Sequence, residues 1–380
     1  MTVQGVMPAH GPTVGLSVTT AEPGLTGGHL DGIGVYSSAL LRELPRAGVA
    51  VQPYSYGRAR QLGVGRPMPH SFALATVRDL LLPGRAAMDV DLYHATDYRI
   101  VRMNRPVVAT LHDALPVAHP EWCNPRLRGL KNWLQAGAAR KADHVIAHTQ
   151  FTIAELVQCF GVDEARISVV PCGVDEAWLD APEAVEVAAT LARHGLRRGY
   201  FLTVGTLQPR KNIERLLAAY LGLPAAVRSQ RQLVIVGAAG ARSAGLVAQI
   251  RAAQQRGENV VWLNELTSAE SLRHVYAGAG VFVFPSLYEG FGIPVVEAFA
   301  SGVPVVVSNA TSLPEVAGGA ALEVDPLSVS AIGAAMLELA RDEALRARHI
   351  AAGRVRALGL TWRETARRTA AVYTQVLEKA

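Results

Sequence analysis

The 380-residue sequence predicts an α/β protein made of two doubly wound, parallel-sheet domains. Short runs rich in valine and isoleucine alternate with longer segments of helical periodicity, and this rhythm occurs in both halves of the chain. Most of the apolar runs are continuous rather than alternating, which is typical of strands buried on both faces of a parallel sheet. The length also favours two domains over one.

Strands are predicted in both halves of the chain. They cover residues 13–19, 92–96, 106–113, 143–149 and 167–171 in the first half, and residues 200–205, 232–237, 259–263, 281–286 and 303–308 in the second. The segments between them read as helices with clear boundaries. Thr267 and Glu270 form a capping box. In "IPVVEAFASG", Pro294 suits a first helical turn and Gly302 suits a C-terminal cap.

The domain boundary is expected in the polar segment around residues 180–198, after "VVPCGVDEAWL". This gives an N-terminal domain of residues 1–182 and a C-terminal domain of residues 183–360. The last segment, residues 361–380, is predicted to be a helix that follows the second domain's pattern.

Composition is typical of a globular protein, with 50% hydrophobic and 18% charged residues. The net charge of +5 suits an anionic small molecule or a membrane surface, and alone it is too weak to indicate nucleic acid. Cys123, Cys159 and Cys172 form no framework, which favours a reducing cytoplasm. The sequence shows neither a signal peptide nor an apolar run of spanning length. A cytoplasmic protein is expected, with peripheral membrane contact left open.

The stretch "PSLYEGFGIPVVEA" follows the buried run VFVF and carries the strongest functional signal. Glu289 lies on the turn, and Gly290 and Gly292 leave the backbone open to a ligand. Glu297 is expected in the first turn of the next helix, where the helix dipole favours its ionised form and where it can accept both hydroxyls of a ribose. The alternative, that each glutamate only stabilises a turn or a helix end, is outweighed by the combined context.

"VGTLQPRKNIERLL" follows another buried strand, which ends at Gly205. Arg210 and Lys211 lie at the start of a helix, and we expect Asn212 to cap that helix. Two cations beside helix N–H groups can bind a diphosphate without a metal. The alternative is a solvated basic turn.

Two stretches of the first half are weaker candidates. "GGHLDGIGVYSS" predicts a flexible glycine loop, containing Gly34, that could approach phosphates or be a mobile surface loop. "VVATLHDALPVAHPEW" places His112 and Asp113 at the end of a buried strand. They could hydrogen-bond sugar hydroxyls or stabilise developing charge, although a lone histidine is more often structural.

Two further patterns have a structural interpretation. Asp89 and Asp91 match the DxD motif that holds a divalent metal in one class of glycosyltransferase, but they precede a strand, at the wrong end of a parallel sheet for a ligand. His94, Asp97 and His148 show no metal-like spacing. Residues 126–141 predict a basic, apolar helix that could lie on an anionic membrane, or be an ordinary amphipathic helix.

The run from Phe282 to Pro326, "FVFPSLYEGFGIPVVEAFASGVPVVVSNATSLPEVAGGAALEVDP", resembles the signature of family 4 of the retaining glycosyltransferases. "VGTLQPRKNIERLL", "TLHDALPVAHPEW", "VIAHTQFTIAELV" and "VVPCGVD" match in the family's order. The resemblance implies the GT-B fold, in which two Rossmann-like domains face a cleft and the final helix packs back on the N-terminal domain. Cys172 departs from the pattern, because the family more often has asparagine there.

The resemblance also implies roles for individual residues. Glu297 would bind the nucleotide ribose, Glu289 would lie close to the donor sugar, and Arg210 and Lys211 would neutralise the diphosphate. His112 would lie at the donor sugar. The remaining donor-binding positions are Gly34, Asp113, Gly205, Gly290, Phe291 and Gly292, and Glu315 lies where the family has an acidic residue.

The implied reaction is transfer of a glycosyl group from a nucleotide diphosphate sugar to an acceptor hydroxyl, with retention and with neither a metal nor another cofactor. The stretch "HD…HPEW" resembles mannosyltransferases that use GDP-mannose in polysaccharide or O-antigen assembly. A glycan or lipid-linked acceptor is expected, and nucleic acid is not. A nucleotide-sugar epimerase and a non-catalytic glycan-binding module are the alternatives. The donor base, the sugar, the linkage and the oligomeric state are left open.

Overall fold

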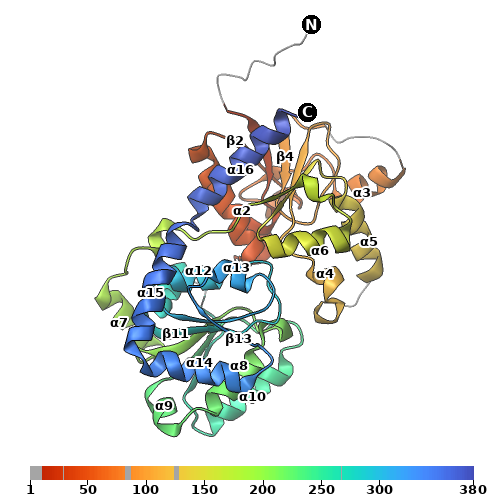
Figure 1. Ribbon diagram of the computed structural model, residues 1–380. Helices are drawn as coiled ribbons and strands as arrows, with labels where there is room; N and C mark the ends of the chain where they lie inside the picture. The colour runs from red at the N-terminus through yellow and green to blue at the C-terminus, as the bar shows by residue number, and fades with distance from the viewer. Residues whose placement is uncertain (1–10, 29, 82–86, 124–127, 267) are drawn as a thin grey trace. The chain divides into compact units, whose positions relative to one another are not determined.

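The computed structural model describes residues 11–28, 30–81, 87–123, 128–266 and 268–380. The chain divides into two compact units, and Figure 1 follows it through both. The first unit comprises Met1–Ala118, Leu127–Cys172 and Trp362–Ala380, and the second comprises His119–Arg126 and Gly173–Thr361. Each unit is built on one parallel sheet flanked by helices, so the predicted fold class is confirmed.

The sheet of the first unit has seven strands in the order β3-β2-β1-β4-β5-β6-β7. The strands are β1 (Thr13–Ser17), β2 (Ala50–Ser55), β3 (Arg66–Pro67), β4 (Leu92–Ala95), β5 (Val107–Thr110), β6 (His144–Ala147) and β7 (Ile167–Val169). Every residue of β4, β5 and β6 is buried, which explains their continuous apolar sequence. The sequence did not predict β2 and β3, whose residues are partly buried or exposed apart from the buried Ser55.

The helices of the first unit include one from the far end of the chain. They are α1 (Pro23–Thr26), α2 (Gly32–Glu43), α3 (Phe72–Leu81), α4 (Leu115–Ala118), α5 (Arg128–Ala139), α6 (Gln150–Phe160) and α16 (Trp362–Leu377). Helix α16, blue in Figure 1, lies against α2. Thr365 donates from Oγ1 to the Pro171 carbonyl oxygen at 2.8 Å, and the Tyr373 hydroxyl lies 2.6 Å from Nδ1 of His94. The terminal helix is thus part of the first unit.

The sheet of the second unit has six strands in the order β10-β9-β8-β11-β12-β13. The strands are β8 (Tyr200–Val204), β9 (Leu233–Val236), β10 (Val260–Leu263), β11 (Ala279–Phe284), β12 (Val305–Ser308) and β13 (Leu322–Val324). The sequence predicted all of these except the three-residue edge strand β13. Numbered within each unit, the strands of both sheets begin 3-2-1-4-5, the order of the Rossmann fold.

The helices of the second unit cover the faces of this sheet. They are α7 (Ala184–Arg193), α8 (Ile213–Leu221), α9 (Ala225–Gln230), α10 (Ala244–Gln255), α11 (Ala269–Gly278), α12 (Ile293–Ala300), α13 (Leu313–Ala317), α14 (Val329–Arg341) and α15 (Glu343–Leu358). Pro294 lies in the first turn of α12, and Gly302 follows its end with a φ of 69°, as predicted. Ser268 caps α11 by accepting from the Ser271 N–H. Thr267, predicted as the cap, lies outside the described residues.

The two units meet in the sequence at Cys172 and Gly173, ten residues before the expected boundary at 182 and 183. The segment around 180–198 lies within the second unit, and it contains α7. Residues 119–126 also belong to the second unit.

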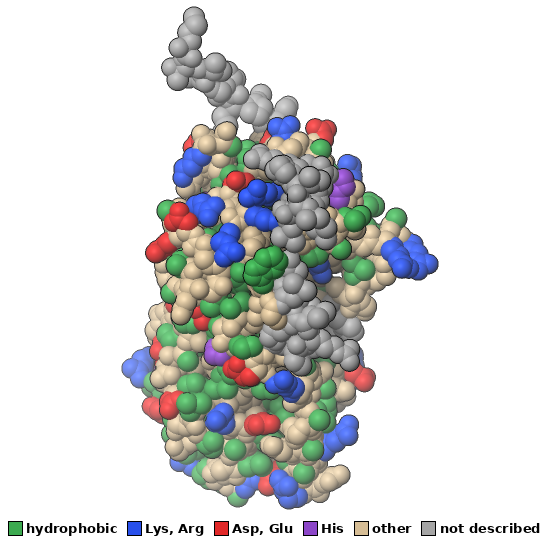
Figure 2. Space-filling view, turned by 90° about the vertical axis from the view of Figure 1, so that its right-hand side faces the viewer, with side chains coloured by type: hydrophobic (Ala, Val, Ile, Leu, Met, Phe, Trp, Pro, Cys, Tyr) green, Lys and Arg blue, Asp and Glu red, His purple; other side chains and the backbone are tan. Residues whose placement is uncertain are grey.

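The surface shown in Figure 2 carries Lys and Arg side chains interspersed with Asp and Glu, in keeping with the modest net charge. The predicted basic helix corresponds to α5, whose Trp133 is 57% exposed. Arg126 and Leu127 lie outside the described residues, as do the side chains of Arg128, Leu130, Lys131 and Leu134. In the described part of the chain, no helix is both long and apolar enough to span a bilayer. Membrane contact stays a prediction.

Candidate active site

The predicted site residues of the second unit lie in the loops after β8 and β11, except Glu297, which lies in helix α12. These strands are neighbours in the sheet, although β9 and β10 lie between them in the sequence. The strand order reverses at this point, and such a switch point is where open parallel sheets bind ligands. Arg210 and Lys211 follow β8 in a short 3-10 helix, and Glu289 follows β11.

Arg210, Lys211 and Glu289 form a compact charge cluster. Nζ of Lys211 donates to Oε1 of Glu289 at 2.6 Å, and Nη1 of Arg210 donates to Oε2 of Glu289 at 2.7 Å. The side chains of Lys211, Arg210 and Glu289 are only 12%, 19% and 8% exposed. The structure therefore brings together three residues that lie on two separate stretches of sequence.

The cluster has a surplus of positive charge, because two cations face one carboxylate. Burial tends to raise the pKa of Glu289, but the charges of Arg210 and Lys211 outweigh it and hold that pKa at about 2. Glu289 is therefore ionised at neutral pH. It orients both cations, and the remaining positive charge suits a bound anion.

Lys211 reaches the cluster by crossing the backbone of Gly205. A Cβ atom at Gly205 would lie 3.4 Å from Cε of Lys211, and the φ of Gly205 is 149°, a conformation that other residues rarely adopt. On another side, Nζ of Lys211 lies 4.8 Å from the centroid of the Phe284 ring, a cation–π contact. A Cβ atom on Gly205, at 3.4 Å, would only touch the lysine stem, so the positive φ, and not crowding by Lys211, favours glycine at this position.

Asn212 does not cap α8 with its side chain, contrary to the prediction. Its φ is 59°, and its side-chain amide donates to the carbonyl oxygens of Pro285 at 2.9 Å and Pro326 at 2.7 Å. Asn212 is 3% exposed, so these two hydrogen bonds satisfy the side-chain N–H groups that solvent cannot reach. The residue ties the loop after β8 to the loop after β11 and so helps to hold the charge cluster.

The glycine-rich turn after Glu289 is buried and held by the loop that follows β12. Oγ of Ser312 donates to the carbonyl oxygens of Glu289 at 2.8 Å and of Phe291 at 3.2 Å. Gly292 is the N-cap of α12 with a φ of 106°. Gly290, Phe291 and Gly292 are all buried. The turn therefore has one defined shape next to the charge cluster, although contact of its amides with a ligand stays a prediction.

Glu297 lies four residues after the start of α12, in its second turn and not in its first. It is partly buried, and its Oε2 accepts a hydrogen bond from the Tyr276 hydroxyl at 2.9 Å. Burial raises the pKa of Glu297 to about 7, and the nearby Asp175 adds to the effect. The prediction that the helix dipole favours the ionised form was therefore wrong, because desolvation dominates here.

This raised pKa predicts how Glu297 affects stability. The pKa of Glu297 is about 7 in the folded protein and 4.5 in the unfolded chain, so protonation of this carboxyl stabilises the fold. That contribution is complete below pH 4.5 and is lost as the pH rises through 7. At roughly 1.4 kcal/mol per pKa unit, the loss is roughly 3 kcal/mol. Glu297→Gln keeps an acceptor for Tyr276 without titrating. Urea unfolding at about pH 5 and about pH 8 should show that Glu297→Gln gains stability over wild type as pH rises; an equal change in both proteins would contradict the assignment.

Gly34 and Asp113 serve local structure in the first unit. The sequence predicts a flexible loop at Gly34, but this residue lies in the first turn of α2, where its N–H donates to Oδ1 of Asp31 at 2.8 Å. A Cβ atom there would lie 2.6 Å from the Thr20 carbonyl oxygen. Oδ1 of Asp113 accepts from the Leu115 N–H at 3.0 Å, at the start of α4. Donor-binding roles for both residues stay predictions.

His112 lies beyond the carboxyl end of β5 and has a partner that sequence reasoning missed. Its Nδ1 is 2.9 Å from Nε2 of His148, which lies beyond the end of β6. The register pairs Thr110 with Ile146, and continuing it by two residues sets His112 opposite His148. The available signal in the sequence was that a histidine lies within two residues of the observed end of each of these two predicted strands. Burial lowers the pKa of both histidines, that of His148 to about 3.

In the part of the chain that the structure describes, neither Asp89 and Asp91 nor the predicted site residues belong to a group of side chains that could hold a metal ion. Among the described residues, one group has donor atoms close enough to hold an ion, formed by Glu186, Glu270 and His274. Oδ2 of Asp91 accepts from the Thr13 N–H at 2.8 Å, at the amino end of β1. This contact agrees with a structural role for the DxD-like motif.

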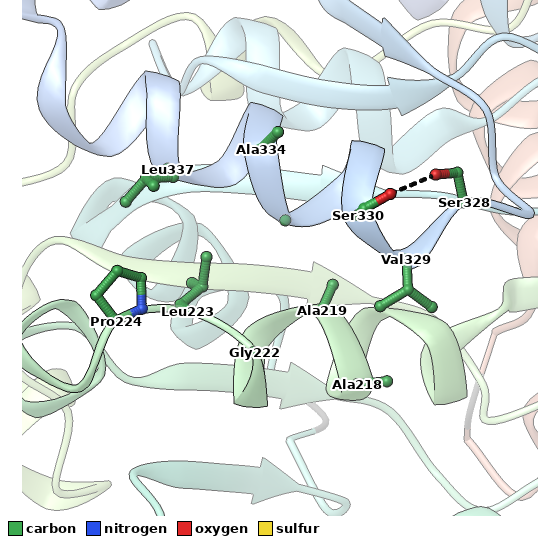
Figure 3. Close-up of a pocket in the computed structure, with 11 residues that line it drawn as sticks. Ala218, Ala219, Gly222, Leu223, Pro224, Ser328, Val329, Ser330, Ala334 and Leu337 are labelled. Carbon is green, nitrogen blue, oxygen red and sulfur yellow. Dashed lines mark hydrogen bonds between the residues drawn. The ribbon is translucent and has the colours of Figure 1, made fainter.

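A cavity of about 670 Å³ lies between α8 and α14 in the second unit (Figure 3). Its lining is apolar apart from Ser328 and Ser330, whose hydroxyl groups lie 3.0 Å apart. Ala218, Ala219 and Leu337 are typical of the rest of the wall. Such a lining offers no charge to a diphosphate, so the candidate site is the Arg210 cluster and not this cavity.

Known proteins resemble this chain over most of its length. The models of Glycosyltransferase Family 4 and of Glycosyl transferases group 1 match residues 30–178 and 192–356, respectively. O-antigen chain mannosyltransferase B of Escherichia coli is 33% identical over 74% of this chain and 74% of its own length. MMP alpha-(1->4)-mannosyltransferase of Mycolicibacterium hassiacum is 28% identical over 83% of this chain and 77% of its own. The structure of sucrose-phosphate synthase from Thermosynechococcus elongatus has a TM-score of 0.73 at 21% identity, covering 97% of this chain and 100% of that one.

The chain has two Rossmann-like sheets with this strand order, and a solved synthase matches nearly its whole length. These two findings define the GT-B class of fold. The chain carries a Glycosyltransferase Family 4 domain followed by a Glycosyl transferases group 1 domain, so it belongs to the glycosyltransferases that these two models describe.

Proposed function

We propose that this glycosyltransferase moves a sugar from a nucleotide diphosphate donor to a hydroxyl of a glycan or lipid-linked acceptor. The observation that carries this proposal is the Arg210–Lys211–Glu289 cluster at the switch point of the second sheet. Its net positive charge would bind the diphosphate, and the buried turn at Gly290–Gly292 would face the sugar. Glu297 would accept the hydroxyls of the ribose.

In the proposed reaction the bond from the anomeric carbon to the diphosphate oxygen breaks while the acceptor oxygen bonds to the same face of that carbon. The acceptor's proton passes to the departing diphosphate oxygen, so the configuration is retained. Arg210 and Lys211 stabilise the charge that develops on the leaving group, which is the role that a metal ion has in other enzymes. The reaction therefore requires no metal.

Mannose from GDP-mannose is the donor that we propose. Two of the relatives, from Escherichia coli and Mycolicibacterium hassiacum, are mannosyltransferases by name, and one of them acts on O-antigen chains. The stretch from His112 to Trp122 supports the same assignment through its resemblance to enzymes of polysaccharide assembly. Such an acceptor would bring the enzyme to the cytoplasmic face of a membrane.

Thermal unfolding with a panel of GDP-, UDP- and ADP-sugars tests the donor. A ligand at about one hundred times its Kd stabilises a protein by about 2.7 kcal/mol, which is a rise in Tm of about 5 to 10 °C for units of this size. We expect GDP-mannose to give the largest rise.

We also expect transfer to continue at its full rate in excess chelator. A strict requirement for Mg²⁺ would contradict the metal-independent site.

Product analysis separates the proposal from its alternatives. An isomerised nucleotide sugar formed from donor alone would indicate an epimerase, and donor binding without turnover on any acceptor would indicate a non-catalytic module. The anomeric configuration of the product, read by NMR, tests retention. An inverted product would overturn same-face attack.

A further inference from the structure

The loop that follows β12 holds both main-chain groups of Glu289. Oγ1 of Thr311 accepts a hydrogen bond from the Glu289 N–H at 3.2 Å, and Oγ of Ser312 donates to the Glu289 carbonyl oxygen at 2.8 Å. Strand β12 lies beside β11 in the sheet, which brings the two loops together, and all of these residues belong to the second unit. Two consecutive side chains therefore bind the main chain of one residue of the charge cluster.

These two contacts fix the direction of the Glu289 side chain. The N–H and C=O groups lie on either side of the Cα atom, so holding both of them leaves the Cα–Cβ bond little freedom to turn. The carboxylate at the end of this side chain bonds Lys211 at 2.6 Å and Arg210 at 2.7 Å. Short, charge-assisted hydrogen bonds of this kind depend on geometry. The places of both cations therefore depend on the main chain of Glu289.

Thr311 makes its contact from a backbone conformation that is unfavourable for threonine. Its φ is 59°, in the left-handed region that favours glycine. The branched Cβ of threonine crowds the backbone there, so a β-branched residue with such a φ is uncommon. Glycine or asparagine would adopt the same conformation at a smaller cost in free energy. Strain of this kind persists where the surrounding structure imposes it, and it clusters at functional positions.

Positive φ values outside glycine gather around the charge cluster. Among the residues that the structure describes, Asn212, Arg242 and Thr311 have them. Asn212 joins the loop after β8 to the loop after β11, and Thr311 joins the loop after β12 to that same loop. Asparagine tolerates this conformation, so the strain lies at Thr311. A glycine at position 311 would remove the strain, but it would also remove the hydroxyl that the Glu289 N–H needs.

We propose that Thr311 is a positioning residue for sugar transfer, whose hydroxyl fixes the main chain of Glu289 and, through the Glu289 carboxylate, the two cations of the cluster. This inference rests on the proposed function, in which those cations bind the diphosphate. Without the hydroxyl the Glu289 N–H loses its acceptor, and because Glu289 is buried, solvent replaces that acceptor poorly. The turn is then free to move, and the cations move with it.

Three substitutions at Thr311 separate the hydroxyl from the strain. Thr311→Ser keeps the hydroxyl and should stay within about threefold of wild type in kcat/KM for the donor. Thr311→Val keeps the branched Cβ and removes the hydroxyl, whereas Thr311→Gly removes both. We expect each of these two to lose about tenfold in kcat/KM, near the upper end of what one neutral hydrogen bond contributes. Thr311→Gly should nevertheless unfold about 2 to 4 °C above Thr311→Val, because glycine relieves the strain.

The matched control is Thr374→Val in α16. Thr374 is also partly buried, and its Oγ1 donates to the Ala370 carbonyl oxygen at 3.3 Å, so this variant loses a threonine hydroxyl away from the candidate site. It should transfer sugar at the wild-type rate. If Thr311 only stabilised the fold, Thr311→Val and Thr311→Gly would also reach the wild-type rate well below their Tm, and that result would overturn the inference.

Two measurements read the role of Thr311 without sugar transfer. Hydrogen exchange at the Glu289 amide, followed by NMR, should be slow in wild type and Thr311→Ser and at least about tenfold faster in Thr311→Val and Thr311→Gly. An unprotected Glu289 amide in wild type would overturn the inference, even if every variant fails to fold. Pyrophosphate should raise the Tm of Thr311→Val less than that of wild type. An equal rise would show that Thr311 does not position the cations.

The proposed function can fail separately. Wild-type protein that transfers no sugar from any donor, but shows the expected exchange rates and the expected response to pyrophosphate, would refute sugar transfer. Thr311 would then still position the two cations for an anion.

Discussion

Lys211→Met should lower kcat for sugar transfer by about 100- to 1000-fold and leave the protein folded. The ammonium group of Lys211 lies 2.6 Å from Glu289 and is one of two cations that would meet the diphosphate as negative charge develops. Removing one such stabilising group costs about 3 to 4 kcal/mol in the transition state. Methionine keeps the unbranched stem beside Gly205 and Phe284, so its packing should change little.

The controls separate lost charge from lost structure. Lys211→Ala should lose transfer to the same extent as Lys211→Met but unfold at a lower temperature, because it also removes the packed stem. Lys379→Met changes an exposed lysine near the end of α16 and should behave as wild type. Turnover close to wild type in Lys211→Met, measured with saturating donor, would refute the diphosphate role of this residue.

Most of the strands that the sequence predicted are buried on both faces, although it also predicted the partly buried edge strands β7 and β10. Strands β4, β5, β8, β9, β11 and β12 are continuous apolar runs, and such runs can be identified without knowing their neighbours. The missed strands lie toward the sheet edges. Pro53 interrupts β2, β3 has two residues and β13 has three. Those strands are defined by the strand beside them, which the local sequence does not contain.

The sequence located the candidate site but not its contacts. A parallel sheet places the loops after its strands at one edge, so the positions of Arg210, Lys211 and Glu289 follow from their place after strands. Their mutual ion pairs do not, because the neighbours β8 and β11 are separated by two other strands in the chain. The pKa of Glu297 was missed for a similar reason, since it depends on burial and on Tyr276 from another helix.

Glu289→Gln should lower Tm by about 10 °C, an effect that pyrophosphate should partly reverse. Glu289 is 8% exposed and balances two side chains that are also largely buried, Arg210 and Lys211. Removing one partner of a buried ion pair costs about 3 to 5 kcal/mol, since the remaining charges lose their counterion, and each kcal/mol is worth about 2 to 4 °C in a unit of this size. Glutamine keeps the size of the side chain, so the change is one of charge.

An added anion should replace the missing carboxylate. In wild type the diphosphate must share Arg210 and Lys211 with Glu289. In Glu289→Gln that carboxylate no longer competes, so the two cations should bind pyrophosphate more tightly. We therefore expect a larger rise in Tm with pyrophosphate for Glu289→Gln than for wild type, together with a loss of transfer, because glutamine no longer orients the two cations. Glu343→Gln, which alters an exposed pair with Arg346, is the matched control. If Glu289→Gln keeps the wild-type Tm and gains nothing extra from pyrophosphate, the charges of this cluster are not balanced by Glu289 and the anion site lies elsewhere.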